Sequence, residues 1–188
     1  YETSHEFVGL VTQPYRTGRG PHKHVNPMKE LANEHGTPVF QPVKANDPES
    51  LGRLREFNAD LFVTAAYGQI LSAELLSIPK IGAINVHASL LPKYRGAAPI
   101  QFAIINGETE TGITIFRIEP KLDAGPILGV VRTDIGKKET YGKLQDRLAD
   151  LAVPLTCKVV DDLAAGTAQE SVQDASLVSR APRLKKAD

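Results

Sequence analysis

Apolar and polar positions change along this chain in blocks that predict strands and helices in turn. Short, mainly apolar runs occupy residues 7–12, 61–66 and 82–87, and such runs are typical of strands buried in a parallel sheet. Residues 111–118 and 127–133 have the same character and predict two further strands joined by a loop. The strand candidates are therefore spread over the whole length of the chain.

Helices are predicted between these runs by capping residues and by apolar side chains at helical spacing. Asn26 and Asp47 each precede a proline, which is the pattern of an N-cap followed by proline at the first helical position. Ser72 can cap a short helix, and Thr140 precedes a long one in which Pro154 predicts a kink. The predicted helices cover residues 27–35, 48–57, 73–76 and 99–107, and the last begins at residue 141.

The alternation of strands and helices indicates an α/β fold. We expect a Rossmann-like, mostly parallel sheet with helices on both faces, and a functional site beyond the carboxyl ends of the strands. The sequence contains neither Gly-x-Gly-x-x-Gly nor a Gly-Lys-Ser/Thr phosphate loop, so these nucleotide-binding motifs are absent.

Composition narrows the class of protein. The 188 residues suit one compact domain, and 41% apolar with 23% charged residues excludes a disordered or fibrous chain. Residues 61–73 form the longest stretch without charge, which is shorter than the ~20 residues of a membrane span. Lys plus Arg equal Asp plus Glu at 22 each, which argues against a protein that is basic all over and binds nucleic acid with its whole surface. The single Cys157 excludes an internal disulfide and fits a reducing compartment.

Two polar residues end one strand candidate. Asn85 and His87 are two positions apart, so both side chains lie on the same face of a strand. An amide donor beside an imidazole can stabilise an oxyanion and move a proton. A polar strand end with ordinary hydrogen bonds has the same spacing, and the spacing alone leaves both interpretations open.

The segment between residues 7 and 29 is basic. Arg16, Arg19, Lys23 and Lys29 occur there with several glycines and no acidic residue. Such a loop is suited to contacting phosphates. A solvated, mobile loop is the alternative interpretation.

A long motif changes the balance. Residues 85–101, NVHASLLPKYRGAAPIQ, resemble the signature of the folate-dependent formyltransferases. Residues 106–116 and 122–127 resemble the segments after that signature in the family, and residues 11–20 and 66–71 resemble two of its loops. The resemblance covers essentially the whole chain. The Gly-Arg-Gly loop and the paired alanines of the signature favour the catalytic domain of the branch that acts on methionyl-tRNA.

The resemblance implies an activity and three catalytic residues. A formyl group passes from 10-formyltetrahydrofolate to the α-amine of methionyl initiator tRNA when the amine attacks the formyl carbon. Asn85 and His87 are implied to hold the oxygen of the tetrahedral intermediate, and Asp123 to orient His87 and a water that carries the proton. Without the resemblance, Asp123 in its Asp-Ala-Gly turn would be interpreted as an ordinary turn residue. No metal is implied.

The resemblance also implies binding residues and a setting. The folate site is expected at Ser89, Leu90, Leu91, Pro92, Tyr67 and Gly68, with Tyr94 a further candidate neighbour. The tRNA contacts are expected at Arg16, Arg19 and Lys23. The expected setting is the cytoplasm of a bacterium or an organelle, with no membrane association and a monomeric full-length protein.

The expected organisation is a formyltransferase domain over residues 1–172 and a linker over residues 173–188 toward a C-terminal tRNA-binding domain. In the family pattern a central strand precedes the segment matching residues 7–12 and lies between it and residues 61–66. We therefore expect this chain to lack the first strand of the fold.

Two alternatives stay open. A related enzyme could use the same chemistry on an amino sugar nucleotide or on glycinamide ribonucleotide, although the basic loop argues against both. The second alternative is a catalytically silent RNA-binding module of the same fold. Zero net charge argues against it, and so does the presence of all three implied catalytic residues, Asn85, His87 and Asp123.

Overall fold

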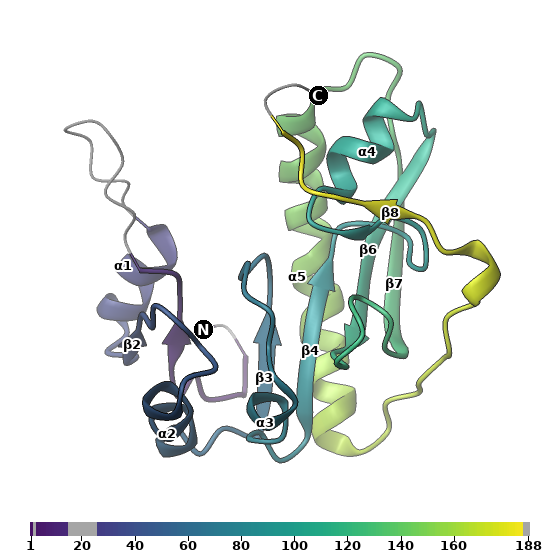
Figure 1. Ribbon diagram of the computed structural model, residues 1–188. Helices are drawn as coiled ribbons and strands as arrows, with labels where there is room; N and C mark the ends of the chain where they lie inside the picture. Colours follow the sequence, from purple (N-terminus) through teal and green to yellow (C-terminus); the bar gives the residue numbers. More distant parts are fainter. Residues whose placement is uncertain (2, 15–25, 186–188) are drawn as a thin grey trace. The chain divides into compact units, whose positions relative to one another are not determined.

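The computed structural model describes residues 1, 3–14 and 26–185, and the chain divides into two compact units. The first unit contains Tyr1–Asp60 and Tyr67–Lys80, and the second contains Leu61–Ala66 and Ile81–Asp188. Each unit has secondary structure of its own (Figure 1).

The first unit is a small parallel strand pair with three helices. Strand β1 (Leu10–Val11) pairs in parallel with β2 (Val39–Phe40), so the strand expected over residues 7–12 is shorter than predicted. The predicted caps are confirmed, because Asn26, Asp47 and Ser72 each accept a hydrogen bond from a backbone N–H of the first helical turn. The helices are α1 (Pro27–Glu34), α2 (Pro48–Glu56) and α3 (Ala73–Leu76).

The second unit is built on a four-stranded mixed sheet in the order β3-β4-β6-β7. Strands β3 and β4 are parallel, whereas β4 with β6 and β6 with β7 are antiparallel. Strands β6 and β7 are joined by a loop and not by a crossover helix, so they form an antiparallel hairpin at one edge of the sheet. The strands are β3 (Leu61–Thr64), β4 (Gly82–His87), β6 (Glu110–Arg117) and β7 (Ile127–Asp134).

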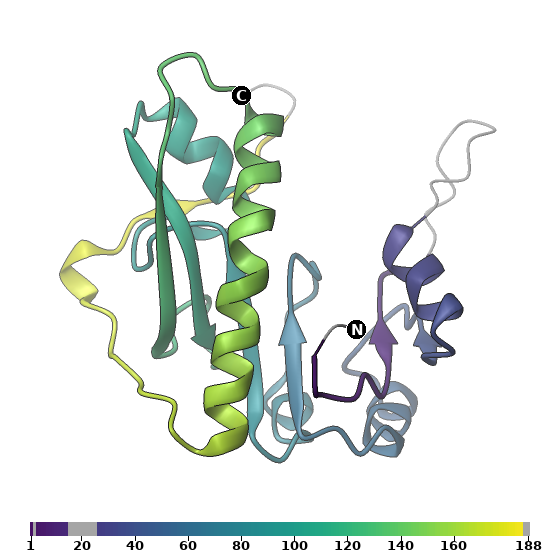
Figure 2. The ribbon, with the colours of Figure 1, turned by 180° about the vertical axis from the view of Figure 1, so that it is seen from behind.

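One long helix covers a face of this sheet. Helix α5 (Tyr141–Ala165) lies along the strands in both ribbon views, and Leu144, Leu148 and Val159 are almost fully buried against the sheet (Figures 1 and 2). The helix continues unbroken through Pro154, and the hydroxyl of Thr140 makes no capping bond, in contrast to the other predicted caps. The predicted helical period therefore locates the core of this unit.

Short elements complete the second unit. Strand β5 (Arg95–Gly96) pairs in parallel with β8 (Arg180–Ala181), and α4 (Pro99–Ile105) comes directly after β5. A 3-10 turn, η1 (Ala175–Leu177), precedes β8. In Figures 1 and 2 the chain leading to β8 crosses the side of the sheet opposite α5. Within the segment expected to be a linker from residue 173, Gln173 and Ala181 are buried in this unit and β8 pairs with β5.

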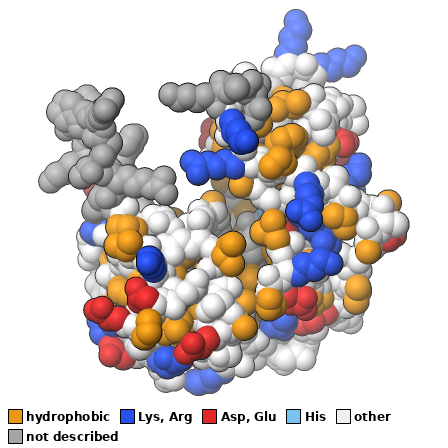
Figure 3. Space-filling view, in the orientation of Figure 1, with side chains coloured by type: hydrophobic (Ala, Val, Ile, Leu, Met, Phe, Trp, Pro, Cys, Tyr) orange, Lys and Arg blue, Asp and Glu red, His pale blue; other side chains and the backbone are white. Residues whose placement is uncertain are grey.

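The α/β alternation predicted from the sequence is confirmed. Among the described residues, β1 pairs only with β2 in the first unit, and β3 pairs only with β4 in the second. Basic and acidic side chains are interspersed on the face seen in Figure 3. No helix in the described part of the chain is long and apolar enough to cross a membrane.

Candidate functional site

Strand β4 carries two of the predicted catalytic side chains. Asn85 is paired with Thr64 of β3, and the Thr64 hydroxyl donates a 2.7 Å hydrogen bond to the Asn85 Oδ1 atom. This bond occupies the amide oxygen and orients the side chain. The Nδ2 group donates no hydrogen bond to any of the described residues. Asn85 therefore presents a fixed, free N–H donor.

His87, two positions along the same strand, is buried with 5% of its surface exposed. Its Nε2 atom lies 2.9 Å from the backbone oxygen of Tyr94. Because a carbonyl oxygen can only accept, Nε2 carries the proton and Nδ1 of the neutral ring has the lone pair. The imidazole and the ring of Phe116 are nearly perpendicular, at 85°, with a centroid distance of 6.2 Å.

Burial determines the charge of His87. Removal from water lowers the pKa of His87 below its ordinary value, while the negative charge of Asp123 and the bond to the Tyr94 carbonyl act in the opposite direction. The net direction is downward, so the imidazole is neutral at pH 7. A neutral imidazole with a free Nδ1 lone pair can act as a base.

Asp123 reaches this region from the loop between β6 and β7. Its Oδ2 atom accepts a 2.7 Å hydrogen bond from the backbone N–H of Gly96. The described structure contains no direct hydrogen bond or ion pair between Asp123 and His87, so their interaction is through charge. Asp123 and Tyr94 both have positive φ angles, +46° and +61°, which non-glycine residues rarely adopt. Backbone conformations of this kind concentrate at functional sites.

The loop of residues 89–92 uses part of the predicted folate set for its own structure. Ser89 is fully buried and its hydroxyl donates to the Lys93 carbonyl at 2.7 Å. Thr114 of β6 donates to the Ser89 carbonyl and accepts from the Leu91 N–H, which anchors the loop to the sheet. Leu91 is buried, whereas Leu90 and Pro92 are half-buried. The loop is therefore rigid, and Leu90 and Pro92 are its half-exposed apolar positions.

Tyr67 and Gly68 belong to the first unit. The Tyr67 carbonyl accepts a 2.9 Å hydrogen bond from the Gln13 side chain, and Gly68 has a φ of +82°. The Tyr67 hydroxyl is buried without a hydrogen-bond partner in the described structure, and burial raises its pKa. The predicted tRNA-binding residues Arg16, Arg19 and Lys23 lie outside the described residues.

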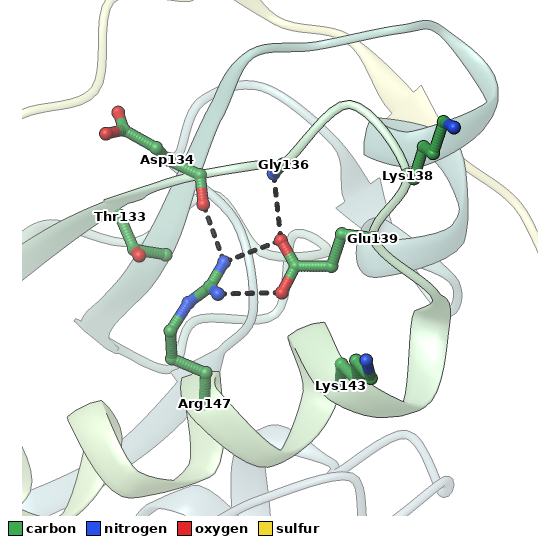
Figure 4. A pocket seen from close by; sticks show the side chains of 7 residues that line it. All are labelled: Thr133, Asp134, Gly136, Lys138, Glu139, Lys143 and Arg147. Carbon is green, nitrogen blue, oxygen red and sulfur yellow. Dashed lines mark hydrogen bonds and ion pairs between the residues drawn. The ribbon is translucent and has the colours of Figure 1, made fainter.

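Two hollows in the surface contain none of the predicted site residues. One, of about 570 Å³, lies between β7 and the start of α5 (Figure 4). There the guanidinium of Arg147 donates to both carboxylate oxygens of Glu139 and to the backbone carbonyl of Asp134. The hydrogen bonds that Glu139 accepts from Arg147 and from the Gly136 N–H lower the pKa of Glu139. The arrangement ties the loop to the helix. The other hollow, of about 460 Å³, is in the first unit around Tyr1 and His35, whose rings stack at 3.8 Å.

Sequence reasoning missed Thr64 and Gln173. Thr64 orients Asn85, and the only local signal for it is its position at the end of the neighbouring strand. Gln173 donates to the backbone carbonyls of Asp123 and Gly125, across 50 and 48 residues of chain, and no local pattern indicates such contacts. No group of three or more His, Cys, Asp or Glu side chains in the described part of the chain is placed to hold a metal ion.

Comparison with known proteins identifies the family of the chain. A family model described as formyl transferase matches residues 2–160. The methionyl-tRNA formyltransferases of Methylococcus capsulatus and Citrifermentans bemidjiense are 46% and 47% identical over 99% and 100% of this chain, and over 61% and 59% of their own length. The chain thus spans about three fifths of the curated relatives it matches.

Solved structures show the same fold. Phosphoribosylglycinamide formyltransferase from Bacillus halodurans has a TM-score of 0.73 at 24% identity, covering 87% of this chain and 83% of its own. An N-formyltransferase from Helicobacter canadensis in complex with folinic acid has a TM-score of 0.70 at 20% identity, covering 92% of this chain and 60% of its own. With most of its length matched by the family model, the chain belongs to the formyl transferase family.

Proposed function

We propose that the chain transfers the formyl group of 10-formyltetrahydrofolate to the α-amine of methionyl-tRNA. The single observation that carries the chemistry is the pairing, on one strand, of a free Asn85 amide donor with a neutral, buried His87. The acceptor is supported by curated relatives of that name, which are about 46% identical over nearly the whole chain.

The residues divide the work of the transfer. When the amine nitrogen attacks the formyl carbon, negative charge develops on the formyl oxygen, and Asn85 Nδ2 is the donor available for it. The new C–N bond leaves a proton in excess on the amine nitrogen, and His87 Nδ1 accepts it. As the bond between the formyl carbon and the folate nitrogen breaks, His87 returns the proton to that leaving nitrogen. Asp123 stabilises the intervening imidazolium by its charge.

This assignment differs in one point from the resemblance. With the Nε2 proton used by the Tyr94 carbonyl, neutral His87 is an acceptor at Nδ1 and donates from that atom only after it has been protonated. In the proposal, Asn85 is therefore the first donor to the oxygen and His87 acts chiefly on the proton.

The formyl donor is proposed to bind at the residues that the resemblance implies, and the loop of residues 89–92 supports this. Leu90 and Pro92 of the second unit offer half-buried apolar surface. Apolar surface with a few fixed polar groups is typical of a site for a flat, partly aromatic molecule. Related structures are complexes with folinic acid or tetrahydrofolate.

The tRNA is proposed to contact the basic loop at Arg16, Arg19 and Lys23, whose charges suit phosphates. Replacing Arg19 is expected to weaken use of tRNA and its dependence on salt while sparing the folate donor. The full-length protein is proposed to be cytoplasmic and monomeric.

The test is a side-by-side formylation assay of the protein as its gene encodes it. Methionyl-tRNA, glycinamide ribonucleotide and an amino sugar nucleotide are offered with the same formyl donor. Formylation of methionyl-tRNA alone is the expected result. A preference for either small acceptor would replace the proposed substrate, and binding of tRNA without transfer to any acceptor would indicate a silent RNA-binding module.

A further inference from the structure

The chain after helix α5 is bonded to both loops of the second unit that carry site residues. We name residues 171–181 the C-terminal strap. Ser171 exchanges two backbone hydrogen bonds with Ile127 at the start of β7. Ser179 accepts from the N–H groups of Tyr94 and Arg95, through its hydroxyl and its carbonyl. The strap therefore connects the β6–β7 loop with the segment after β4.

Close approach of the strap requires a glycine at position 96. Gly96 has a φ of +128°, and a Cβ atom there would lie 2.5 Å from the carbonyl oxygen of Ala181. The same residue donates its N–H to the Asp123 carboxylate. The strap thus packs directly on the backbone that holds Asp123.

Gln173 is the central polar contact of the strap. It is 8% exposed, and its Nε2 atom donates to the carbonyls of Asp123 at 3.0 Å and Gly125 at 2.7 Å. Its Oε1 atom accepts from Nε and a terminal nitrogen of Arg95, at 3.2 and 2.7 Å. Carbonyls only accept and a guanidinium only donates, so the orientation of the amide is unambiguous and all its hydrogen-bonding capacity is used.

These bonds have two consequences for Asp123. The first is that the left-handed backbone of Asp123 is held from both sides, by Gln173 at its carbonyl and by Gly96 at its carboxylate. The second concerns Arg95, whose guanidinium is engaged by a neutral amide. The described structure gives Arg95 no ion pair with Asp123, so the Arg95 guanidinium does not neutralise the charge of that carboxylate.

We propose that Gln173 is a positioning residue of the formyl-transfer site, which holds the Asp123 loop in place and keeps the Arg95 guanidinium from pairing with the Asp123 carboxylate. This inference rests on the proposed function. It also places Gln173 and the strand β8 within the folded second unit, so that any linker begins after Ala181.

The experiment compares the wild type with Gln173→Met in the protein as its gene encodes it. Methionine has a similar length and removes all four bonds. We expect kcat to fall by about 10- to 100-fold, as small displacements of catalytic groups do, with KM for the formyl donor within about twofold of wild type. The matched control is Val172→Ala, because Val172 is 92% exposed and is expected to leave both constants unchanged.

A second readout separates positioning from general support of the fold. The pKa of His87, followed by NMR, is expected to move downward in Gln173→Met, because the opposing influence of Asp123 is weakened. In an Asp123→Asn background the same substitution is expected to move that pKa no further. If Gln173→Met does not fold, Gln173→Glu retains the acceptor for Arg95 and loses the donors, and its kcat is expected to fall similarly.

The outcomes are distinguishable. Wild-type kcat in the Gln173 variants, an unchanged His87 pKa, or a pKa shift that persists in the Asp123→Asn background would each overturn the inference. If the wild type transfers no formyl group to any acceptor, the proposed function fails, while the His87 titration still decides whether Gln173 acts through Asp123.

Discussion

The Nε2 atom of His87 and the backbone oxygen of Tyr94 lie 2.9 Å apart. Tyr94 has a positive φ and follows the strand that carries His87. This contact assigns the tautomer of His87 without reference to any ligand. The geometry of a backbone loop therefore decides which nitrogen of the imidazole is free for chemistry.

The first prediction concerns the titration of His87. Its pKa is lowered chiefly by burial, so kcat/KM is expected to be constant at neutral pH and to fall only below about pH 6.5, as the imidazolium forms and loses its acceptor. Asp123 raises this pKa, so Asp123→Asn should move the acidic limb to still lower pH. Nitrogen-15 NMR should report protonated Nε2 and free Nδ1 at pH 7. A pKa at or above about 6.5 would contradict the prediction.

Removing the imidazole should affect turnover and not donor binding. We expect His87→Ala to lower kcat by about 10²- to 10⁴-fold, the usual contribution of a general base, with KM for the formyl donor within about twofold. Steady-state kinetics give both constants. His35→Ala, an exposed histidine just after α1, is the control. A large rise in KM at normal kcat would assign His87 to binding.

Removing the amide of Asn85 should lower kcat as much as removing one hydrogen-bond donor to an oxyanion does in other enzymes. Asn85→Ala is expected to lower kcat by about 10²- to 10³-fold, which corresponds to roughly 3–4 kcal/mol. Thr64→Val preserves the amide and removes the hydroxyl that orients it, so a smaller loss is expected. Equal losses for the two variants would show that Asn85 acts through the local fold and not as a donor.

The turn that carries Asp123 depends on Gly125. A Cβ atom at Gly125 would lie 1.8 Å from the Arg117 carbonyl oxygen, so Gly125→Ala must displace the loop. We expect a loss of about 1–3 kcal/mol in unfolding free energy, measured in urea, together with reduced kcat. Gly142→Ala, with nothing within 4 Å of the added atom in the first turn of α5, should be neutral or stabilising by up to about 1 kcal/mol.

The ring of Tyr94 should matter for stability more than for catalysis. Its hydroxyl donates to Glu108 at 2.6 Å and accepts from Asn106 at 3.1 Å. Tyr94→Phe is expected to cost about 1–3 kcal/mol of unfolding free energy while kcat stays within about twofold, because the backbone oxygen that binds His87 remains. Tyr141→Phe, at an exposed position, is the matched control. A large loss of kcat at unchanged stability would mean that the phenol contacts the substrate.

The sequence by itself determined the features that depend on neighbouring residues. Side-chain oxygens at Asn26, Asp47 and Ser72 predicted helix starts because each bonds a backbone N–H two or three positions along the chain. The period of two along β4 predicted that Asn85 and His87 share a face. Both signals are local and specific to residue type, which is why composition and spacing contain them.

Only the tertiary structure decided how these residues are held. Gly96 meets Asp123 across 27 residues, Tyr94 meets Ser179 across 85, and Arg95 meets Gln173 across 78. Most of the atoms that organise the site are backbone N–H and C=O groups, which every non-proline residue carries alike. A hydrogen bond to a backbone group does not depend on the type of residue that supplies the group, so the sequence contains no signal for it. The tautomer of His87 and the role of Gln173 therefore depend on how the loops pack.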